Sequence, residues 1–536
     1  MNIFINQNEI NQNMRSICVD WLVSVEDELE FKSSTTNLAI TLMDRYIFLE
    51  NNISKKNLQA IAICCMNLAS KLNETMHIGI NQCAYYTADI YVPEYLAKLE
   101  YEILKTLNFD VYKPILFNML RLIRKEINCS LESSFFSNYL TYVLLITTEY
   151  LYFNPKKLAN HIVKFAIKIK EINNNNDLES FINSNIYYQY IFTMWNNYRS
   201  GKLNDIQKKY EHCRFKQISK TPIPKINCHY NLNHLPKKIH KSYNTNLNYN
   251  IKVYSYKDIS RMNKIKDLGK GTFGIVEHMR YNDKDIALKY LKCPDEIDAF
   301  VVREICNMNH LNHKNILQIH GVYYNYYKNQ FSIGLELASQ SLYNKIYCEE
   351  ETISESCKSK YILQFLSGIK YMHKHEIMHR DLSLNNILIT FDENLKICDF
   401  GQSKIFYQNI SAYYSSGICT YTSRAIELFF DYPQYNEKID IWSCACIIGI
   451  ILNGDNLFNI TSESDAKYEI FKILGSPKDL DYITDEIPEY ERIGFTELES
   501  KYPNETMILY KMLDYDPNKR ISASEALTMF KNLYNN

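Results

Sequence analysis

The chain has 536 residues, too many for one hydrophobic core, so we expect roughly two to four domains. Hydrophobic residues make up 46% of the sequence and charged residues 23%, and the formal net charge is -1. These values are typical of a globular protein and argue against a nucleic-acid or membrane-surface role driven by charge.

The sequence has 15 cysteines but no C-x-x-C pair of the kind that holds zinc, which predicts reduced thiols in an intracellular protein. Its start, MNIFINQNEINQN, lacks the basic residues and apolar run of a signal peptide. No later apolar stretch reaches the ~20 residues that a membrane helix needs. We therefore expect a soluble protein of the nucleus or cytoplasm, with no membrane contact and no direct nucleic-acid contact.

Residues 14 to 220 read as helix after helix, with no strand pattern between them. Apolar residues recur there at helical spacing. One such series is Leu58, Ile61, Ala62, Cys65, Leu68, Ala69 and Leu72. We predict that this half of the chain is all-α.

Residues 221–259 are polar and irregular, with Pro222, Pro224 and Pro236 and no apolar period, which predicts a linker. A flexible linker of this length has a root-mean-square span of ~35 Å. It would keep each half of the chain at an effective concentration in the millimolar range around the other half. Docking of the two halves within one chain is therefore easy. Exchange of halves between two chains stays open.

Residues 260–536 begin with strand-like runs at 265–279 and 284–291 and continue as helices from residue 295. This order predicts an α+β domain in which a small sheet-rich lobe is followed by a larger helical lobe. We expect any chemistry of the chain to lie in this half, because the motifs described next all fall within it.

Gly269, Gly271 and Gly274 lie between strand-like residues, where a backbone without side chains can fold over a triphosphate. Alone, such a turn fits an ordinary hairpin equally well. Lys289, on the following strand, can reach the α- and β-phosphates. Glu304 stands in an apolar helical stripe, where a buried carboxylate needs a cation, and Lys289 is the candidate. The alternative places Glu304 at the edge of that stripe.

The most specific pattern is HRDLSLNN followed by ICDFG. Asp381 would accept the proton of an attacking hydroxyl, and Asn386 and Asp399 would supply oxygen ligands for Mg2+. These motifs occur in the right order on the right predicted elements, which indicates phosphoryl transfer.

With these motifs, residues 260–536 resemble a protein kinase domain, and more narrowly the cyclin-dependent kinases. The segments VVREI, KIDIWSCACIIG and KMLDYDPNKRISASEAL are similar to that family. The resemblance implies a bilobal fold, ATP and Mg2+ as cofactors, protein substrates and a buried Glu427–Arg520 ion pair. The nucleotide-binding residues that it implies are Leu268, Gly269, Lys270, Gly271, Thr272, Phe273, Gly274, Ile275, Val276, Ala287, Lys289, Glu336 and Ala338.

Several residues depart from the family's pattern. Ser383 stands where most serine/threonine kinases have a lysine that contacts the γ-phosphate. Loss of one charge-assisted contact of ~1.5 to 3 kcal/mol would slow transfer roughly ten- to a hundredfold. Ile426 replaces a proline, which we interpret as a packing change. Phe273 replaces an inhibitory tyrosine, so that phosphorylation switch is lost, although Thr272 remains available.

The resemblance also implies regulatory and specificity residues. Thr420 matches the threonine that serine/threonine kinases place beside the catalytic aspartate. Arg424 matches a residue linked to proline-directed recognition, although Thr422 and Ser423 replace the aromatic pair that accompanies it. Ser415 aligns with the activating phosphothreonine, and an ordinary loop serine is the alternative. The cations that would clamp its phosphate are Arg303, Arg380 and Lys404.

The first half resembles a cyclin. MRSICVDWLV, LMDRY, LASKLNE and KLEYEILKTLNFD are similar to the cyclin box, which we place at residues 14–112. Residues 113–220 resemble the second cyclin repeat. In cyclins a substrate-docking patch lies near the start of the box, but Cys18 and Ser24 alter it here. We therefore expect core packing for its apolar residues, which are Met14, Ile17 and Trp21.

Four charges lie inside apolar helical patterns of this half, where burial requires a partner. The resemblance implies that Arg15 and Asp44 lock helices together. It implies that Lys71 and Glu100 grip the kinase half beside the helix of Glu304, in an intramolecular cyclin-kinase contact. The alternative is four solvated charges on helix faces.

We therefore expect an ATP-dependent serine/threonine protein kinase of the cyclin-dependent type, with a built-in cyclin, that acts in cell-cycle or transcription control. The alternative is a weakly active or silent scaffold that binds or sequesters cell-cycle partners. Ser383 supports the scaffold best. The joint presence of Lys289, Asp381, Asn386 and Asp399 speaks against it.

Overall fold

The computed structural model divides the chain into two compact units. The first holds Met1–Asn250 together with Asp295–Ile297, and the second holds Ile251–Pro294 and Asp298–Asn536. The structure describes residues 3–113, 115–172, 174–226, 228, 230, 238–240, 251–271, 274–292, 296–325, 328, 330–349, 353–406, 412–413, 421–430, 432, 434–460, 462–477, 480 and 489–535.

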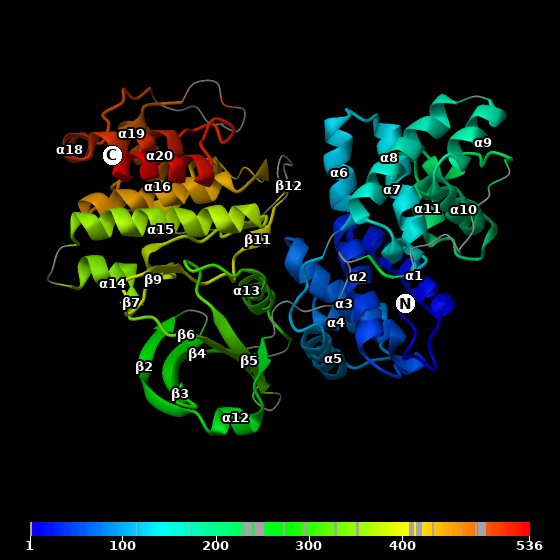
Figure 1. Cartoon of the computed structure of the whole chain (residues 1–536), viewed down its shortest axis with the longest axis horizontal. Coiled ribbons are helices and arrows are strands. Elements are labelled where there is room, and N and C mark those ends of the chain that lie inside the picture. The colour runs from blue at the N-terminus through cyan, green and yellow to red at the C-terminus, as the bar shows by residue number, and fades with distance from the viewer. Residues whose placement is uncertain are drawn as a thin grey trace. The chain divides into compact units, whose positions relative to one another are not determined.

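The described part of the first unit is built of helices, as the apolar spacing predicts (Figure 1). The first helical group has α3 at its centre, because α3 carries apolar residues around most of its circumference and packs against α1, α2 and α5. This group consists of α1 (Gln12–Leu29), α2 (Ser33–Leu49), α3 (Leu58–Asn73), α4 (Ile80–Tyr86) and α5 (Pro93–Thr106). The second group consists of α6 (Leu116–Glu126), α7 (Leu131–Leu145), α8 (Pro155–Glu171), α9 (Asn175–Asn183), α10 (Ile186–Ser200) and α11 (Asp205–Glu211).

A buried ion pair joins the two helical groups. Arg15 on α1 donates to both carboxylate oxygens of Asp44 on α2, at 2.6 and 2.8 Å. Arg15 also donates to the carbonyls of Leu145 and Ile146 at the end of α7, each at 2.8 Å. Tyr150 donates its hydroxyl hydrogen to Asp44 at 2.8 Å. The expected lock between helices is therefore present, and it fixes the second group to the first.

The start of α1 corrects one expectation. Ile17 is 58% exposed, and Met14 and Trp21 are half-buried. The buried stripe of α1 passes instead through residues such as Val19 and Leu22. Core packing was therefore the wrong interpretation for Ile17, which lies on the solvent side of the helix.

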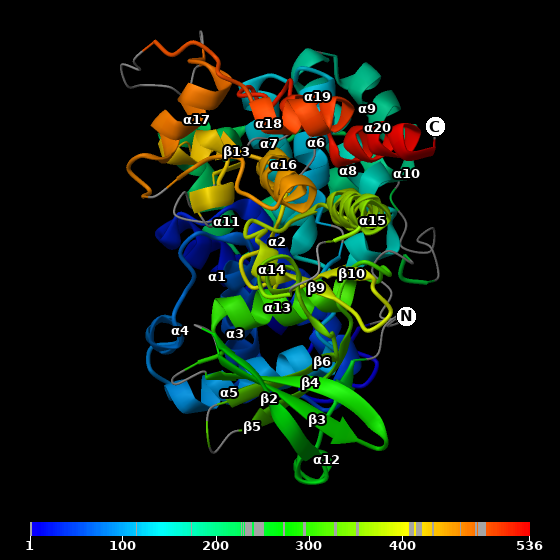
Figure 2. The ribbon, with the colours of Figure 1, turned by 90° about the vertical axis from the view of Figure 1, so that its left-hand side faces the viewer.

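A six-stranded sheet forms one lobe of the second unit, in the order β1-β5-β6-β4-β3-β2. β1 runs parallel to β5, and the other neighbours are antiparallel. α13 contacts β5, and Figure 2 shows α13 on the side of the sheet that faces the helical lobe. The elements are β1 (Lys252–Val253), α12 (Tyr256–Ser260), β2 (Asn263–Gly271), β3 (Gly274–Tyr281), β4 (Lys284–Lys292), α13 (Ala299–His310), β5 (Ile319–Asn325) and β6 (Gln330–Glu336).

Residues of the stretch expected to be a linker contact each of the two units. On the first unit, the His240 amide donates to the Leu151 carbonyl at 2.8 Å. On the second unit, the ring of Tyr254 covers two glycines of the sheet, and a Cβ at Gly321 would come within 2.6 Å of that ring. The Tyr254 ring fits against the sheet because Gly321 has no side chain, so this glycine has a packing role.

The helical lobe of the second unit is organised around α16, which is buried along nearly its whole length and packs against α15 and α19. The ion pair between Glu427 and Arg520 is present, with two contacts of 2.8 and 2.9 Å. Its helices are α14 (Leu342–Tyr347), α15 (Glu355–Lys374), α16 (Lys438–Asn453), α17 (Ala466–Leu474), α18 (Thr496–Lys501), α19 (Pro503–Met512) and α20 (Ala523–Asn535).

Short strands pair in small sheets within this lobe. β7 (Gln340–Ser341) and β10 (Leu395–Ile397) flank β9 (Ile387–Ile389), and β11 (Lys404–Ile405) pairs with β8 (Ile377–Met378). β12 (Ala412–Tyr413) pairs with β13 (Gln434–Tyr435). The chain thus has a helical half followed by a two-lobed α+β domain, which confirms the predicted fold class. No helix among the described residues is both long and apolar enough for a membrane span.

Candidate active site

A cavity of 480 Å³ lies between the sheet and the helical lobe of the second unit. Eleven of the predicted catalytic, nucleotide and metal residues line it, from β2 and β3 at one side to the loop before β11 at the other. They are Leu268, Gly269, Gly274, Val276, Ala287, Lys289, Glu304, Glu336, Ala338, Asn386 and Asp399.

Two predicted nucleotide residues whose side chains the structure describes do not line this cavity. Lys270 and Ile275 are partners in the β2–β3 ladder, and Ile275 is exposed. Successive side chains of a strand point to opposite faces, so Gly274 and Val276 face the cavity and Ile275 does not. Thr272 and Phe273 lie outside the described residues, and Gly271 is described only by its place at the end of β2.

Lys289 on β4 and Glu304 on α13 meet across the cavity wall. The Lys289 Nζ lies 2.7 Å from the Glu304 carboxylate and 3.9 Å from Asp399 Oδ1. Glu304 is 1% exposed, so it does not lie at the edge of its helical stripe. Burial raises the pKa of Glu304, and the lysine opposes that rise. Burial would lower the pKa of Lys289, but the two carboxylates raise it overall, so the ammonium stays charged.

Asp381 lies in the loop before β9, and Asn386 holds it. The Asn386 side-chain nitrogen donates to the Asp381 carbonyl at 2.8 Å and to its carboxylate at 3.2 Å. Burial and the nearby Asp399 raise the pKa of Asp381. The carboxylate is therefore a stronger base than an exposed aspartate, as an acceptor of a hydroxyl proton needs to be.

Asp440, on α16, was missed by the sequence analysis. It holds the loop that carries Asp381 through hydrogen bonds to backbone amides. Its carboxylate accepts from the backbone amides of His379 and Arg380 at 2.8 and 2.9 Å, and lies 2.9 Å from His373 Nε2. Burial alone would raise the pKa of Asp440, but these donors lower it. The available signal was a lone carboxylate in the apolar run KIDIWSCACIIG, where burial requires donors.

The residues present fit a nucleotide and Mg2+. Asp399 and Asn386 bring one carboxylate and one amide to the same wall as Lys289. The Asn386 nitrogen is used by Asp381, so its amide oxygen is the atom that can face a cation. Mg2+ is commonly held by one or two such oxygens together with phosphates. The Asp399 backbone has φ 63°, a conformation often kept at functional sites despite its strain.

The three predicted phosphate-clamping cations lie on separate elements. Arg303 precedes Glu304 on α13, Arg380 lies in the loop before Asp381 and is buried, and Lys404 pairs with Met378 across β11 and β8. Ser415 and Thr420, the residues expected to be phosphorylated and to contact Asp381, lie outside the described residues.

The other pair that the cyclin resemblance singled out, Lys71 and Glu100, lies in the first unit. Their side chains are 2.7 Å apart, and neither is exposed to solvent. Lys71 also lies 3.0 Å from the Glu296 carboxylate and donates to the Ile297 carbonyl at 2.6 Å. Arg15 and Asp44 are buried too, so solvated charges are the wrong interpretation for all four residues.

Lys71 thus faces two carboxylates with a single charge. Burial raises the pKa of Glu100 to about 7, and the lysine only partly offsets this. Glu100 Oε2 is buried and has no hydrogen-bond partner among the described residues. The Glu296 partner was missed, because in the polar sequence CPDEIDAF it reads as an ordinary surface charge.

Comparison with known proteins agrees with both halves of this description. Residues 262–530 match the model of the protein kinase domain, and residues 1–112 match that of the cyclin N-terminal domain. Three relatives from Acanthamoeba polyphaga mimivirus carry the names of serine/threonine-protein kinases. One is 35% identical over 100% of this chain and 96% of its own length. The others are 34% and 33% identical, over 98% and 97% of this chain and 98% of their own lengths.

Proposed function

Since the chain belongs to the serine/threonine protein kinases and carries an N-terminal cyclin domain, we propose that it is a kinase of the cyclin-dependent type with a built-in activator. In this proposal it transfers the γ-phosphate of ATP to serine or threonine of proteins in cell-cycle or transcription control. One observation carries the proposal: Lys289 is paired with Glu304 at 2.7 Å beside Asp399, the arrangement that phosphoryl transfer in kinases requires.

The chemistry follows from the positions of the side chains. Asp381 would accept the proton of the substrate hydroxyl. The hydroxyl oxygen then forms a bond to the γ-phosphorus, while the bond between the γ-phosphorus and the oxygen that bridges it to the β-phosphate breaks. Lys289 would hold the α- and β-phosphates, and Asn386 and Asp399 would hold Mg2+. Bound Mg2+ neutralises charge on the phosphates. Asp440 keeps the loop of Asp381 in place through the backbone amides.

The contacts of Lys71 support a role of the cyclin domain in activation. Lys71, paired with Glu100, contacts Glu296 and the Ile297 carbonyl, and α13 begins only two residues later, at Ala299. We propose that this anchor fixes the start of α13, so that Glu304 stays paired with Lys289. Removal of residues 1–220 should then abolish most of the activity, and an equally active isolated kinase domain would contradict this step.

Ser383 affects the expected rate of phosphate transfer. It leaves the γ-phosphate without the cation that most serine/threonine kinases supply, so we propose a slow but active enzyme. Ser383→Lys should raise kcat roughly ten- to a hundredfold if nothing else compensates for the missing charge. An unchanged or lower kcat would show that another group already supplies this charge.

The deciding experiment measures γ-phosphate transfer from ATP with Mg2+ to a mixture of serine and threonine peptides. The intact chain is compared with Asp381→Asn, which preserves the size of the side chain and removes its basicity. We expect loss of transfer in the variant. Equal transfer by both proteins would rule out the enzyme and leave the silent scaffold as the function.

A further inference from the structure

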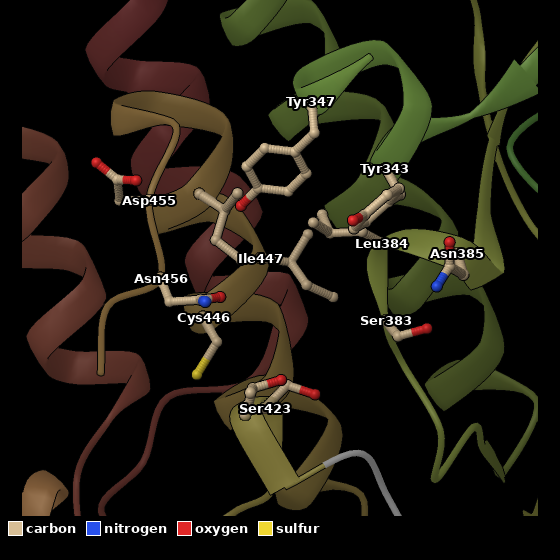
Figure 3. A pocket seen from close by; sticks show the side chains of 12 residues that line it. Tyr343, Tyr347, Ser383, Leu384, Asn385, Ser423, Cys446, Ile447, Asp455 and Asn456 are labelled. Atoms are coloured by element: carbon tan, nitrogen blue, oxygen red, sulfur yellow. The ribbon is translucent and has the colours of Figure 1, made fainter. Parts of the chain in front are cut away.

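A second cavity of 450 Å³ opens beside the loop that carries Asp381 (Figure 3). Tyr343 and Tyr347 of α14 form one wall, and Ile447 of α16 forms another. Ser383 lines the cavity from the loop side, and Asp455 lines it beyond the end of α16. This space is distinct from the nucleotide cavity, with which it shares only Asn385 among the described lining residues.

Its position makes it a site for the protein substrate. Ser383 and Asn385 are two and four residues after Asp381, and Asn386 is bonded to the Asp381 carboxylate. The cavity also reaches Thr422 and Ser423, of which Ser423 donates to the backbone of the same loop at 3.0 Å. A substrate whose hydroxyl meets Asp381 would therefore pass a neighbouring side chain over this cavity.

The aromatic wall is open to an incoming group. Tyr343 and Tyr347 are 42% and 44% exposed, although they are large and apolar. Their rings lie 5.1 Å apart at an angle of 57°. Aromatic faces attract cations, and a guanidinium also stacks on them.

The charge at the cavity has one sign. Asp455 is exposed and forms no ion pair among the described residues, and its carboxylate adds to burial in raising the pKa of Tyr347. None of the described lining residues is a lysine or an arginine. A lysine at position 383 would add a cation to this lining, and Ser383 does not. The cavity therefore combines aromatic faces, one carboxylate and no opposing positive charge.

We propose that this cavity binds an arginine side chain of the protein substrate, close in sequence to the phosphorylated residue, between the Tyr343–Tyr347 wall and Asp455. Arginine is preferred to lysine because its planar group can stack on a ring while it donates to a carboxylate. This inference rests on the proposed kinase activity. It adds a charge preference that the family resemblance does not supply.

The first test is an arginine scan with the full-length protein. Peptides share one central serine and otherwise alanine and glycine, and carry a single arginine at each position from four before to four after the serine. We expect one position at which arginine lowers KM about five- to thirtyfold relative to leucine, with lysine intermediate. Peptide transfer without preference for arginine at any position would overturn the inference and leave the kinase proposal standing.

The second test uses Asp455→Asn. We expect this variant to raise the KM of the best arginine peptide about fivefold, and to leave kcat, the KM of ATP and the KM of the leucine peptide unchanged. Asp392→Asn, another exposed aspartate of the same lobe, is the matched control and should change nothing. If Asp455→Asn affects arginine and leucine peptides equally, the Asp455 carboxylate does not recognise the arginine and the inference fails. Absence of transfer to every peptide would instead count against the proposed function.

Discussion

We expect the buried cluster around Lys71 to make the stability of the cyclin domain depend on pH. Lys71 lies 2.7 Å from Glu100 and 3.0 Å from Glu296, so one cation faces two carboxylates. The other titratable groups near Glu100 are the thiols of Cys64 and Cys83, whose pKa values burial raises, so that they stay neutral near pH 7. The perturbation that isolates this cluster is Glu100→Gln, which keeps the shape of the side chain and removes its titration.

The sign of the effect follows from the pKa of Glu100. Burial raises it from 4.5 to about 7, so the folded protein binds a proton that the unfolded chain has released in this range. The stabilisation from that proton is complete below pH 4.5 and is lost as the pH rises to about 7. The loss corresponds to about 3 kcal/mol, because one pKa unit is worth ~1.4 kcal/mol. In Glu100→Gln this part of the pH dependence should disappear.

The assay is urea unfolding of the full chain at pH values from 4.5 to 8, with a hydrogen-exchange pulse at one fixed pH and readout on peptides of α3 and α5. The difference in unfolding free energy between wild type and Glu100→Gln should change by about 3 kcal/mol across this range. Glu102→Gln, on the same helix but not fully buried, is the control. Parallel curves for wild type and Glu100→Gln would refute the reasoning, because Glu100 would then be ionised throughout.

Three further substitutions test the kinase domain. Asp440→Asn should lower kcat about ten- to a hundredfold with an unchanged KM for ATP, because the loop amides lose a charged acceptor; steady-state kinetics that show a KM effect alone would contradict this. Tyr254→Ala should destabilise the sheet lobe by about 3 to 5 kcal/mol in urea unfolding, and Tyr254→Phe should be nearly neutral; equal losses would point to the hydroxyl instead. Glu427→Gln should cost about 3 to 5 kcal/mol by leaving Arg520 buried without its anion, and a Glu427→Met/Arg520→Met double variant should recover part of this; no recovery would argue against a penalty from an unpaired charge.

The sequence was sufficient to predict site residues where their positions depend on a local pattern. The HRD and DFG segments place Asp381, Asn386 and Asp399 by their spacing along a loop and adjoining strands. The pairing of Lys289 with Glu304 could also be predicted, since a carboxylate in an apolar helical stripe demands a cation. Local spacing and one rule of burial therefore predicted these five residues, whereas most of the other predicted residues of the nucleotide cavity were implied only by the resemblance to kinases.

What could not be predicted depends on contacts between distant segments. Glu296 reads as a surface charge until it is seen beside Lys71, 225 positions earlier in the chain. Tyr254 lies in a polar stretch, and only the bare backbone of Gly321 and Gly334 shows why its ring is buried. The pattern of a strand or helix determines which face is apolar, but it does not identify the partner on that face.

The serine at position 383 links the rate of this kinase to its choice of substrate. A lysine there would stabilise the γ-phosphate, but it would also line the second cavity and repel a basic side chain near Asp455. The two effects act on different kinetic constants, since the first appears in kcat and the second in the KM of arginine peptides. Ser383→Lys should therefore raise kcat for all peptides and weaken the preference for arginine over leucine. If kcat rises while the preference is unchanged, the missing lysine concerns the phosphate alone and the arginine binds elsewhere.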